Sequence, residues 1–124
     1  MKIVKLQDIP GMTFPTGRTT RVLSGQNVLS TKQFTCGYVT MEPQGKVPRH
    51  AHSNEEVYII VGGIGRMQVG DEEEWVEAVS AVYIPPNLPH SLQNTGQEEL
   101  TMIFVYAPAG IVDHWSEEMQ GKLK

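Results

Sequence analysis

Residues 50–56 read H-A-H-S-N-E-E, and residues 85–90 read P-P-N-L-P-H. These two stretches hold three of the four histidines in the chain of 124 residues. Their spacing predicts that three imidazoles and one carboxylate ligate a single divalent metal ion. Such a mixture of ligands suits a first-row transition metal, because calcium and magnesium prefer shells made of oxygen alone. The four expected metal ligands are His50, His52, Glu56 and His90.

The spacing within the first stretch sets a geometric condition. Two residues that are two positions apart on a strand, such as His50 and His52, project from one face about 6–7 Å apart. Metal–nitrogen bonds of about 2.1 Å can close that gap. Glu56 would lie about 13 Å beyond His52 on an extended strand, so the chain must turn between them. We expect His50 and His52 on one strand, a tight turn over residues 53–55, and Glu56 at the start of the next strand. His90 is expected on a distant strand that folds back over these two.

The residues around His50 and His52 decide whether this pair is interpreted as a metal site. Two histidines at this spacing can also belong to an exposed strand face, and a short motif by itself carries a real risk of false matches. The surrounding residues, however, resemble the two motifs of the cupin superfamily. The matching residues are Gly45, His50, His52, Glu56 and Gly63 in the first motif, residues 45–63, and Pro85, Asn87, His90 and Asn94 in the second, residues 79–94.

The chain departs from these motifs at three places. Val79 stands where the second motif opens with glycine, and Asn87 stands where another glycine is usual. Gly45 is one residue closer to His50 than the usual spacing. Asn87 is a mild change, because asparagine tolerates a positive φ better than other non-glycine residues. None of the departures falls on an expected metal ligand.

The resemblance implies a complete set of structural expectations. It implies an all-β fold, the double-stranded β-helix or jelly-roll barrel of the cupins, with a short helix or tail at the C-terminus. It also implies one cupin domain over residues 1–124. Cupins of this kind commonly pair, so a homodimer is expected, with contacts from the N-terminal strand and residues 18–23, since open sheet edges invite pairing.

The pattern of turns along the chain predicts the same architecture. Short segments that alternate apolar and polar residues are separated by Gly, Pro or Asn, which is typical of an antiparallel sandwich or barrel. The first residues also follow a short strand pattern, and Asp113 is expected to cap a helix that runs to Met119 and ends at Gly121. The glycines around residue 63 are expected in a hairpin turn, because Gln68 breaks a G-x-G-x-x-G pattern. Nine strands are predicted, over residues 18–23, 33–41, 47–52, 56–61, 64–69, 73–77, 81–85, 90–94 and 99–106.

Composition argues against several classes of protein. The formal net charge is −4, without a basic cluster, which argues against a nucleic-acid groove. No apolar run approaches the roughly 18 residues that would span a membrane, and Gln7 and Asp8 interrupt any signal-peptide core. Cys36 is the only cysteine. We therefore expect no internal disulfide, a buried apolar role for its side chain, and a cytoplasmic protein.

The ligand set predicts an open metal site. Three neutral imidazoles and one carboxylate would leave a divalent ion with a net charge of about +1, and an octahedral ion would keep two positions for water or substrate. Manganese, iron, nickel or copper is expected. Zinc is compatible but favours four ligands, and it would then have no open position. Such an ion can polarise a carbonyl oxygen or lower the pKa of bound water.

Alternation along the strands predicts which side chains face the metal. On the last strand, either the set that contains Phe104 or the set that contains Ile103 faces inward, and the sequence does not choose between them. Tyr58 is the candidate catalytic residue, as an acid–base or substrate-orienting group, with core packing or a hydrogen bond to a metal ligand as the alternative. The other expected inward residues are Ile60, Met67, Val69, Leu92 and Asn94, with Asn94 expected to secure backbone. His114 lies outside both motifs and is expected at the surface or at a docking contact, unless the terminal segment folds over the barrel mouth.

Two classes of function stay open, because a fold does not choose a reaction. The first is a metal-dependent enzyme that acts on a small oxygenated organic substrate, with dioxygenase, decarboxylase, lyase and isomerase chemistry all compatible. The second is a binding or sensor cupin that holds a sugar or organic acid without turnover. The enzyme is favoured, because sensor cupins often lose metal ligands and are usually fused to a DNA-binding helical domain.

Overall fold

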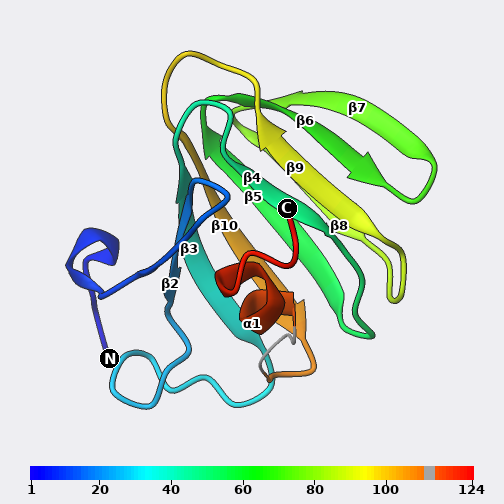
Figure 1. The fold of residues 1–124 in the computed structure, drawn as a ribbon. Coiled ribbons are helices and arrows are strands. Elements are labelled where there is room, and N and C mark those ends of the chain that lie inside the picture. Colours follow the sequence, from blue (N-terminus) through cyan, green and yellow to red (C-terminus); the bar gives the residue numbers. More distant parts are fainter. Residues whose placement is uncertain (111–113) are drawn as a thin grey trace.

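Two layers of antiparallel strands form the molecule. The computed structural model describes residues 1–110 and 114–124 (Figure 1). A six-stranded sheet has the order β1-β2-β3-β10-β5-β8, and a four-stranded sheet has the order β4-β9-β6-β7. The strands are β1 (Met12–Phe14), β2 (Arg18–Val22), β3 (Thr35–Met41), β4 (Lys46–His50), β5 (Glu55–Gly62), β6 (Ile64–Val69), β7 (Glu72–Glu77), β8 (Ser80–Ile84), β9 (His90–Asn94) and β10 (Leu100–Ala107). This arrangement is the predicted jelly-roll, so the predicted fold class is confirmed.

The nine predicted strands all occur, with ends that differ by at most two residues. The N-terminal segment differs from the prediction: Leu6–Asp8 forms a 3-10 turn instead of a strand. The short strand β1 was not predicted, because three residues between Gly11 and Pro15 show too little alternation to be recognised. β2 lies between β1 and β3. Residues 18–22 are therefore inside the sheet, and β1 forms one of its two edges.

The inner faces of the two sheets form one core. Along β10, burial alternates strictly, and the set that contains Phe104 faces inward while the set that contains Ile103 does not. Tyr58 and Ile60 on β5 and Leu92 on β9 are buried as predicted. Twelve buried residues make up this core: Val39, Met41, Val47, Tyr58, Ile60, Met67, Ile84, Leu92, Leu100, Met102, Phe104 and Tyr106.

A second, smaller cluster lies on the outside of the large sheet. It contains Ile9, Leu23 and Cys36, which are each at most 9% exposed. Cys36 is a free thiol packed among apolar side chains, so its predicted role as a small buried residue is confirmed. This cluster fixes the N-terminal segment against the barrel.

One helix, α1 (His114–Met119), follows β10 and lies at the opening between the two sheets (Figure 1). The predicted helix is confirmed, although its expected cap, Asp113, lies outside the described residues. Gly121 ends it as predicted, with a φ of 75° and a backbone N–H that donates to Glu118 O. In the part of the chain that the structure describes, no helix has the length and apolar character needed to cross a membrane.

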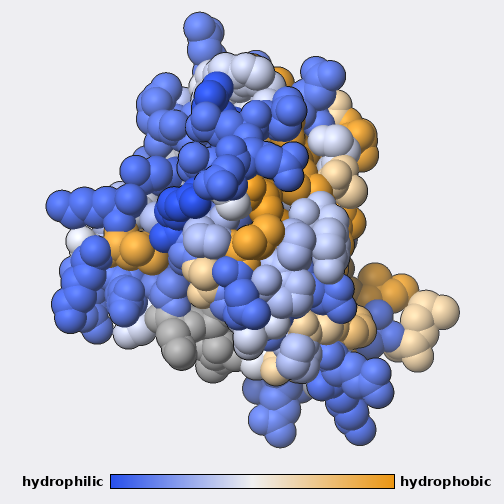
Figure 2. Space-filling model, turned by 90° about the vertical axis from the view of Figure 1, so that its right-hand side faces the viewer, coloured by the Kyte–Doolittle hydropathy of each residue, from blue (hydrophilic) through white to orange (hydrophobic). Residues whose placement is uncertain are grey.

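The outer surface of the β7–β8 region is mixed in character. β7 exposes a run of glutamates around Trp75, which is 67% exposed and lies under the guanidinium of Arg66. Val79 and Tyr83 are also exposed. Figure 2 shows apolar side chains gathered in a strip on this side, bordered by polar ones.

Gly63 joins β5 of the large sheet to β6 of the small sheet, so the predicted hairpin turn at this glycine is wrong, because the two strands that it connects do not pair with each other. Its φ is 88°, and a Cβ added there would lie 3.0 Å from Glu99 O and from Leu100 Cα. Gly70 also has a positive φ, of 59°, but an added Cβ would meet only the Leu88 side chain, at 3.7 Å. Gly63→Ala should lower the free energy of unfolding by about 2 kcal/mol or more, and Gly70→Ala by about 1 kcal/mol, because only Gly63 combines φ strain with a backbone clash. Urea unfolding of both variants measures the difference. Equal losses would show that Glu99 and Leu100 move aside without cost.

Candidate metal centre

The four predicted ligands come from three strands and one loop. His50 is the last residue of β4 and His90 is the first of β9, and the two are directly paired across the strands. Glu56 lies on β5, where its neighbours are Tyr106 and Ile84. The predicted common strand for the first two histidines is wrong: β4 ends at His50, and His52 lies in the connection to β5. Because the chain leaves the strand after His50, His52 lies close to Glu56. A straight strand would keep the two side chains apart.

The ligand atoms meet in a small volume. One nitrogen from each histidine and one carboxylate oxygen of Glu56 all lie within 4.8 Å of one another. His52 Nε2 is 3.0 Å and His90 Nε2 is 3.3 Å from Glu56 Oε1. His50 and Glu56 are at most 9% exposed and His90 is fully buried. The cluster is therefore shielded from solvent and compact enough to surround one ion.

Backbone carbonyls fix all three imidazoles in the tautomer that a metal requires. The Nδ1 atoms of His50, His52 and His90 lie 2.7, 3.1 and 2.9 Å from the carbonyl oxygens of Pro48, Asn54 and Leu88. A carbonyl oxygen only accepts, so each Nδ1 carries the proton and donates. In the neutral rings each Nε2 then keeps its lone pair. This carbonyl–imidazole arrangement is the usual support for a metal-bound histidine.

The electrostatics of the cluster agree with a role as a cation site. Burial lowers the pKa of His50 to about 2, helped by the neighbouring histidines, so this ring is neutral. Burial also acts to lower the pKa of His52, but the hydrogen bond to Glu56 and the negative charge of Glu56 outweigh it, so the pKa of His52 is raised. Burial would raise the pKa of Glu56, yet contacts with His52 and His90 lower it. The negative charge of Glu56 is thus favoured by the side chains around it, as a cation site requires.

One buried atom has no hydrogen-bond partner within the cluster. His90 Nε2 has none among residues 1–110 and 114–124, and its 3.3 Å contact with Glu56 lacks hydrogen-bond geometry. A buried nitrogen without a partner is unfavourable, and its lone pair faces the other three ligands. The residues present therefore fit a divalent transition-metal ion. The donor set, three nitrogens and one oxygen, is also that of such ions rather than of calcium.

His114 lies at this centre, so the expectation that it is a surface residue is wrong. Its ring stacks on that of His50 with a centroid separation of 3.6 Å and an interplanar angle of 21°. Its side chain is only 10% exposed. Burial, together with the charge of Arg18, lowers the pKa of His114 to about 3. The alternative that we considered, a terminal segment folded over the barrel mouth, describes the structure, because α1 delivers this ring to the cluster.

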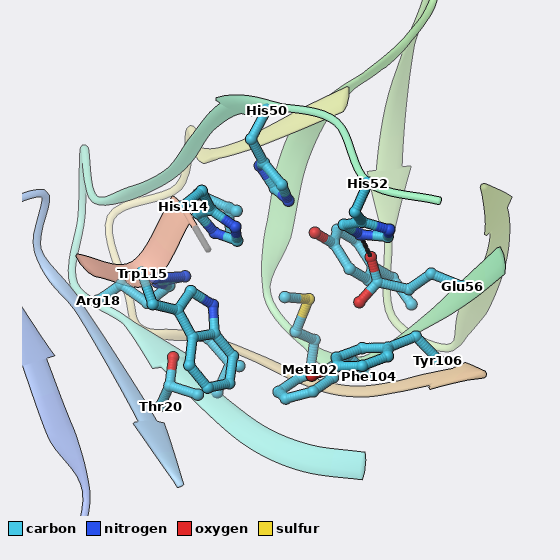
Figure 3. A pocket seen from close by; sticks show the side chains of 13 residues that line it. Arg18, Thr20, His50, His52, Glu56, Met102, Phe104, Tyr106, His114 and Trp115 are labelled. Atoms are coloured by element: carbon cyan, nitrogen blue, oxygen red, sulfur yellow. Dashed lines mark hydrogen bonds and ion pairs between the residues drawn. The ribbon is translucent and has the colours of Figure 1, made fainter. Parts of the chain in front are cut away.

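A cavity of about 20 Å³ is lined by three of the four ligands, His50, His52 and Glu56. Figure 3 shows His50, His52 and Glu56 on one side of it and Arg18, Thr20 and Trp115 on the other. Its floor is apolar and contains Met102, Phe104 and Tyr106 from β10. The volume suffices for about one water molecule, so α1 leaves very little space beside the metal cluster.

Arg18 and Thr20, which line the far side of this cavity, were not predicted from the sequence, and neither was Glu118, which pairs with Arg18. Arg18 and Glu118 form an ion pair in which both side chains are at most 3% exposed, and Thr16 also donates to Glu118. Burial raises the pKa of Glu118, while Arg18 and Thr16 oppose that shift. Alternation on β2 could have identified Arg18 and Thr20 as inward residues. Nothing local indicated Glu118, because its partner is about a hundred residues away in the chain.

The remaining predicted site residues fall into two groups. Tyr58 is 2% exposed and lines the cavity, with its ring centroid 6.1 Å from that of His90. Burial raises the pKa of Tyr58 well above its usual value. Asn94 holds backbone as predicted: its amide donates to Met41 O and Glu98 O, and its Oδ1 accepts from Gly96 N. Asn87 adopts a φ of 68°, so the residue that replaces a motif glycine takes the conformation that glycine would supply.

Two known proteins are similar in sequence to this chain. The chain is 26% identical over 98 residues to auxin-binding protein 1 of Arabidopsis thaliana, which covers 72% of the chain and 50% of that protein. It is 29% identical over 102 residues to H2HPP isomerase of Bacillus subtilis, which covers 78% of the chain and 42% of that protein. The chain thus spans half or less of these two relatives.

Solved structures and a family profile extend the comparison. A structure described as a "predicted oxalate decarboxylase" from Thermotoga maritima superposes with a TM-score of 0.77 at 18% identity, over 86% of this chain and 99% of that one. At that identity the likeness shows the fold alone. The profile of the family described as "Cupin domain" matches residues 37–106, which is more than half of the chain. The chain therefore belongs to the cupin family.

Proposed function

We propose that this cupin binds one divalent transition-metal ion through His50, His52, Glu56 and His90 and acts as a metal-dependent enzyme on a small oxygenated organic substrate. The observation that carries the proposal is the convergence of these four ligand atoms within 4.8 Å, with every imidazole held in the metal-binding tautomer. Manganese, iron, nickel or copper is the expected ion, with zinc as a compatible alternative.

The protein's own groups define what the site can do. When bound, the ion would supply a Lewis acid able to polarise a substrate oxygen. The three carbonyl-anchored histidines fix the position of that oxygen, and the apolar floor beneath them excludes water. Tyr58 supplies a phenol at the cavity wall that can orient substrate, and it is the proposed catalytic residue. The proposed class covers dioxygenase, decarboxylase, lyase and isomerase chemistry.

A binding protein without turnover is the second candidate. One observation favours it: the cavity is small and has His114 and Trp115 of α1 in its wall, which suits the retention of a ligand more than rapid exchange. The names of the relatives divide between the two classes, since one is an auxin-binding protein and another an isomerase. The enzyme is preferred, because the chain keeps a full set of four ligands beside this cavity.

Metal analysis and chelation test the proposal. Protein expressed with added transition metals should carry close to one ion per chain by elemental analysis, because the ligand atoms are already arranged around one point. If the protein is an enzyme, turnover of a small oxygenated substrate should disappear when a chelator removes the ion and return when the ion is restored. Metal-free protein after supplemented expression would contradict the site. Ligand binding that persists unchanged without the ion would favour the binding protein.

A further inference from the structure

Three polar atoms of residues that line the cavity make no hydrogen bond in the described part of the chain. Arg18 Nε, Thr20 Oγ1 and His114 Nε2 are shielded from solvent and make no hydrogen bond within residues 1–110 and 114–124. Arg18 and Thr20 are 3% and 2% exposed. Each buried group of this kind is unfavourable unless something satisfies it. All three residues line the cavity that adjoins the metal cluster.

These groups approach the cavity from the side opposite the metal ligands. Arg18 and Thr20 lie at alternate, inward positions of β2, and His114 comes from α1 (Figure 3). The guanidinium N–H can only donate, and a hydroxyl can donate as well. The atom that would satisfy both is an acceptor, such as a ligand oxygen.

The charges of the site favour a negative ligand. Arg18 is already paired with Glu118, so this pair is neutral overall. A divalent ion beside the single carboxylate of Glu56 would leave a net charge of about +1, and a buried charge without compensation is unfavourable. A ligand with one negative charge would restore neutrality. A neutral ligand would leave the cavity positive.

We propose that Arg18, Thr20 and His114 form a subsite for the carboxylate of a small organic acid, whose second oxygen faces the metal cluster. This inference rests on the proposed metal site and names the class of its substrate or ligand. The cavity of about 20 Å³ limits that acid to a compact molecule and requires Trp115, which lines the same cavity, to move when it enters. Arg18 is held in place for this role by Glu118 and by the ring of Phe14, 4.1 Å away.

Glycolate and its neutral amide, glycolamide, test the subsite because they share a shape and differ in charge. The assay uses manganese-loaded protein in which Trp75→Phe removes the other, exposed tryptophan, so emission reports Trp115 alone. Glycolate should give a saturable change, and glycolamide should bind at least about tenfold more weakly, as expected for hydrogen bonds to a charged group. Elemental analysis of the same samples gives the metal content separately.

Thr20→Val is the decisive variant, with Thr20→Ser as its matched control. Valine keeps the shape but lacks the hydroxyl, so glycolate affinity should fall by about tenfold while metal content stays unchanged. Serine keeps the hydroxyl and should stay close to the parent protein. Thr20 Oγ1 makes no hydrogen bond within the described residues, so Thr20→Val should be at least as stable toward urea as the parent protein. If the hydroxyl had a structural role, the variant would be less stable.

The outcomes separate the subsite from the metal site. Three results with metal-loaded protein would overturn the subsite and leave the metal site intact. The parent protein could bind neither probe, it could bind both equally, or the Thr20→Val variant could bind glycolate as well as the parent does. Parent protein that holds no metal overturns the proposed function instead. In that case, a preference for glycolate that is lost with Thr20→Val would still support the subsite.

Discussion

Replacing His90 by alanine should lower the affinity for a transition-metal ion by more than about 100-fold, which is the upper range for residues that merely orient metal ligands. His90 is fully buried, and its Nε2 atom has no hydrogen-bond partner in the described part of the chain. Its removal takes one nitrogen from the four converging ligand atoms. Competition with a chelator of known affinity, followed by elemental analysis, measures the loss.

His114→Ala is the matched control for this experiment. His114 lies in the same cavity and stacks on His50, but it is not one of the four converging ligands. It should therefore keep most of the metal, whereas His52→Ala should lose metal as His90→Ala does. Circular dichroism before and after loading checks that each variant is folded. Full metal content in folded His90→Ala, or equal losses in His90→Ala and His114→Ala, would show that the four residues do not form the ion's binding site.

The second large effect is expected at the buried ion pair that holds α1. Glu118→Gln should lower the free energy of unfolding by about 3–5 kcal/mol, because it leaves the charge of Arg18 buried without a counter-charge. Both side chains are at most 3% exposed, so water cannot compensate unless α1 leaves the barrel. Urea unfolding of the metal-free protein measures the loss, with Trp115 emission reporting whether α1 stays in place.

Two further variants make this test specific. Glu117→Gln removes a charge from the adjacent, exposed position and should change stability by no more than about 0.5 kcal/mol. The double variant Arg18→Met with Glu118→Leu should recover much of the loss, because an apolar pair of similar volume often replaces a buried ion pair without cost. If Glu118→Gln is as stable as Glu117→Gln, the pair is not the contact that secures α1.

Local pattern was enough to find most of the barrel. Alternation with a period of two located nine strands and assigned Tyr58, Ile60 and Leu92 to the core, because burial on one face of a sheet imposes that period. It did not choose the inward face of β10, where both alternating sets contain apolar residues. It also missed β1, which has three residues and gains its place only by pairing with β2.

In the candidate metal centre, too, some features could be predicted from the sequence and others depended on the tertiary structure. The types and spacing of His50, His52, Glu56 and His90 identified the set, because few other patterns place three imidazoles and a carboxylate together. The common strand for the two nearer histidines was wrong, because the strand ends at His50 where it pairs with His90. That end depends on a partner forty residues away, which no local signal contains.

The sequence by itself determined the family, the strands and the expected metal ligands of this protein, because each rests on short-range spacing that the backbone translates directly into geometry. Only the tertiary structure decided that His114 stacks on His50, that Arg18 pairs with Glu118, and that α1 reduces the cavity to about 20 Å³. These features join the two ends of the chain. They arise because buried polar groups need hydrogen-bonding or charged partners. Which partner is available depends on proximity in the folded structure and not on distance along the sequence.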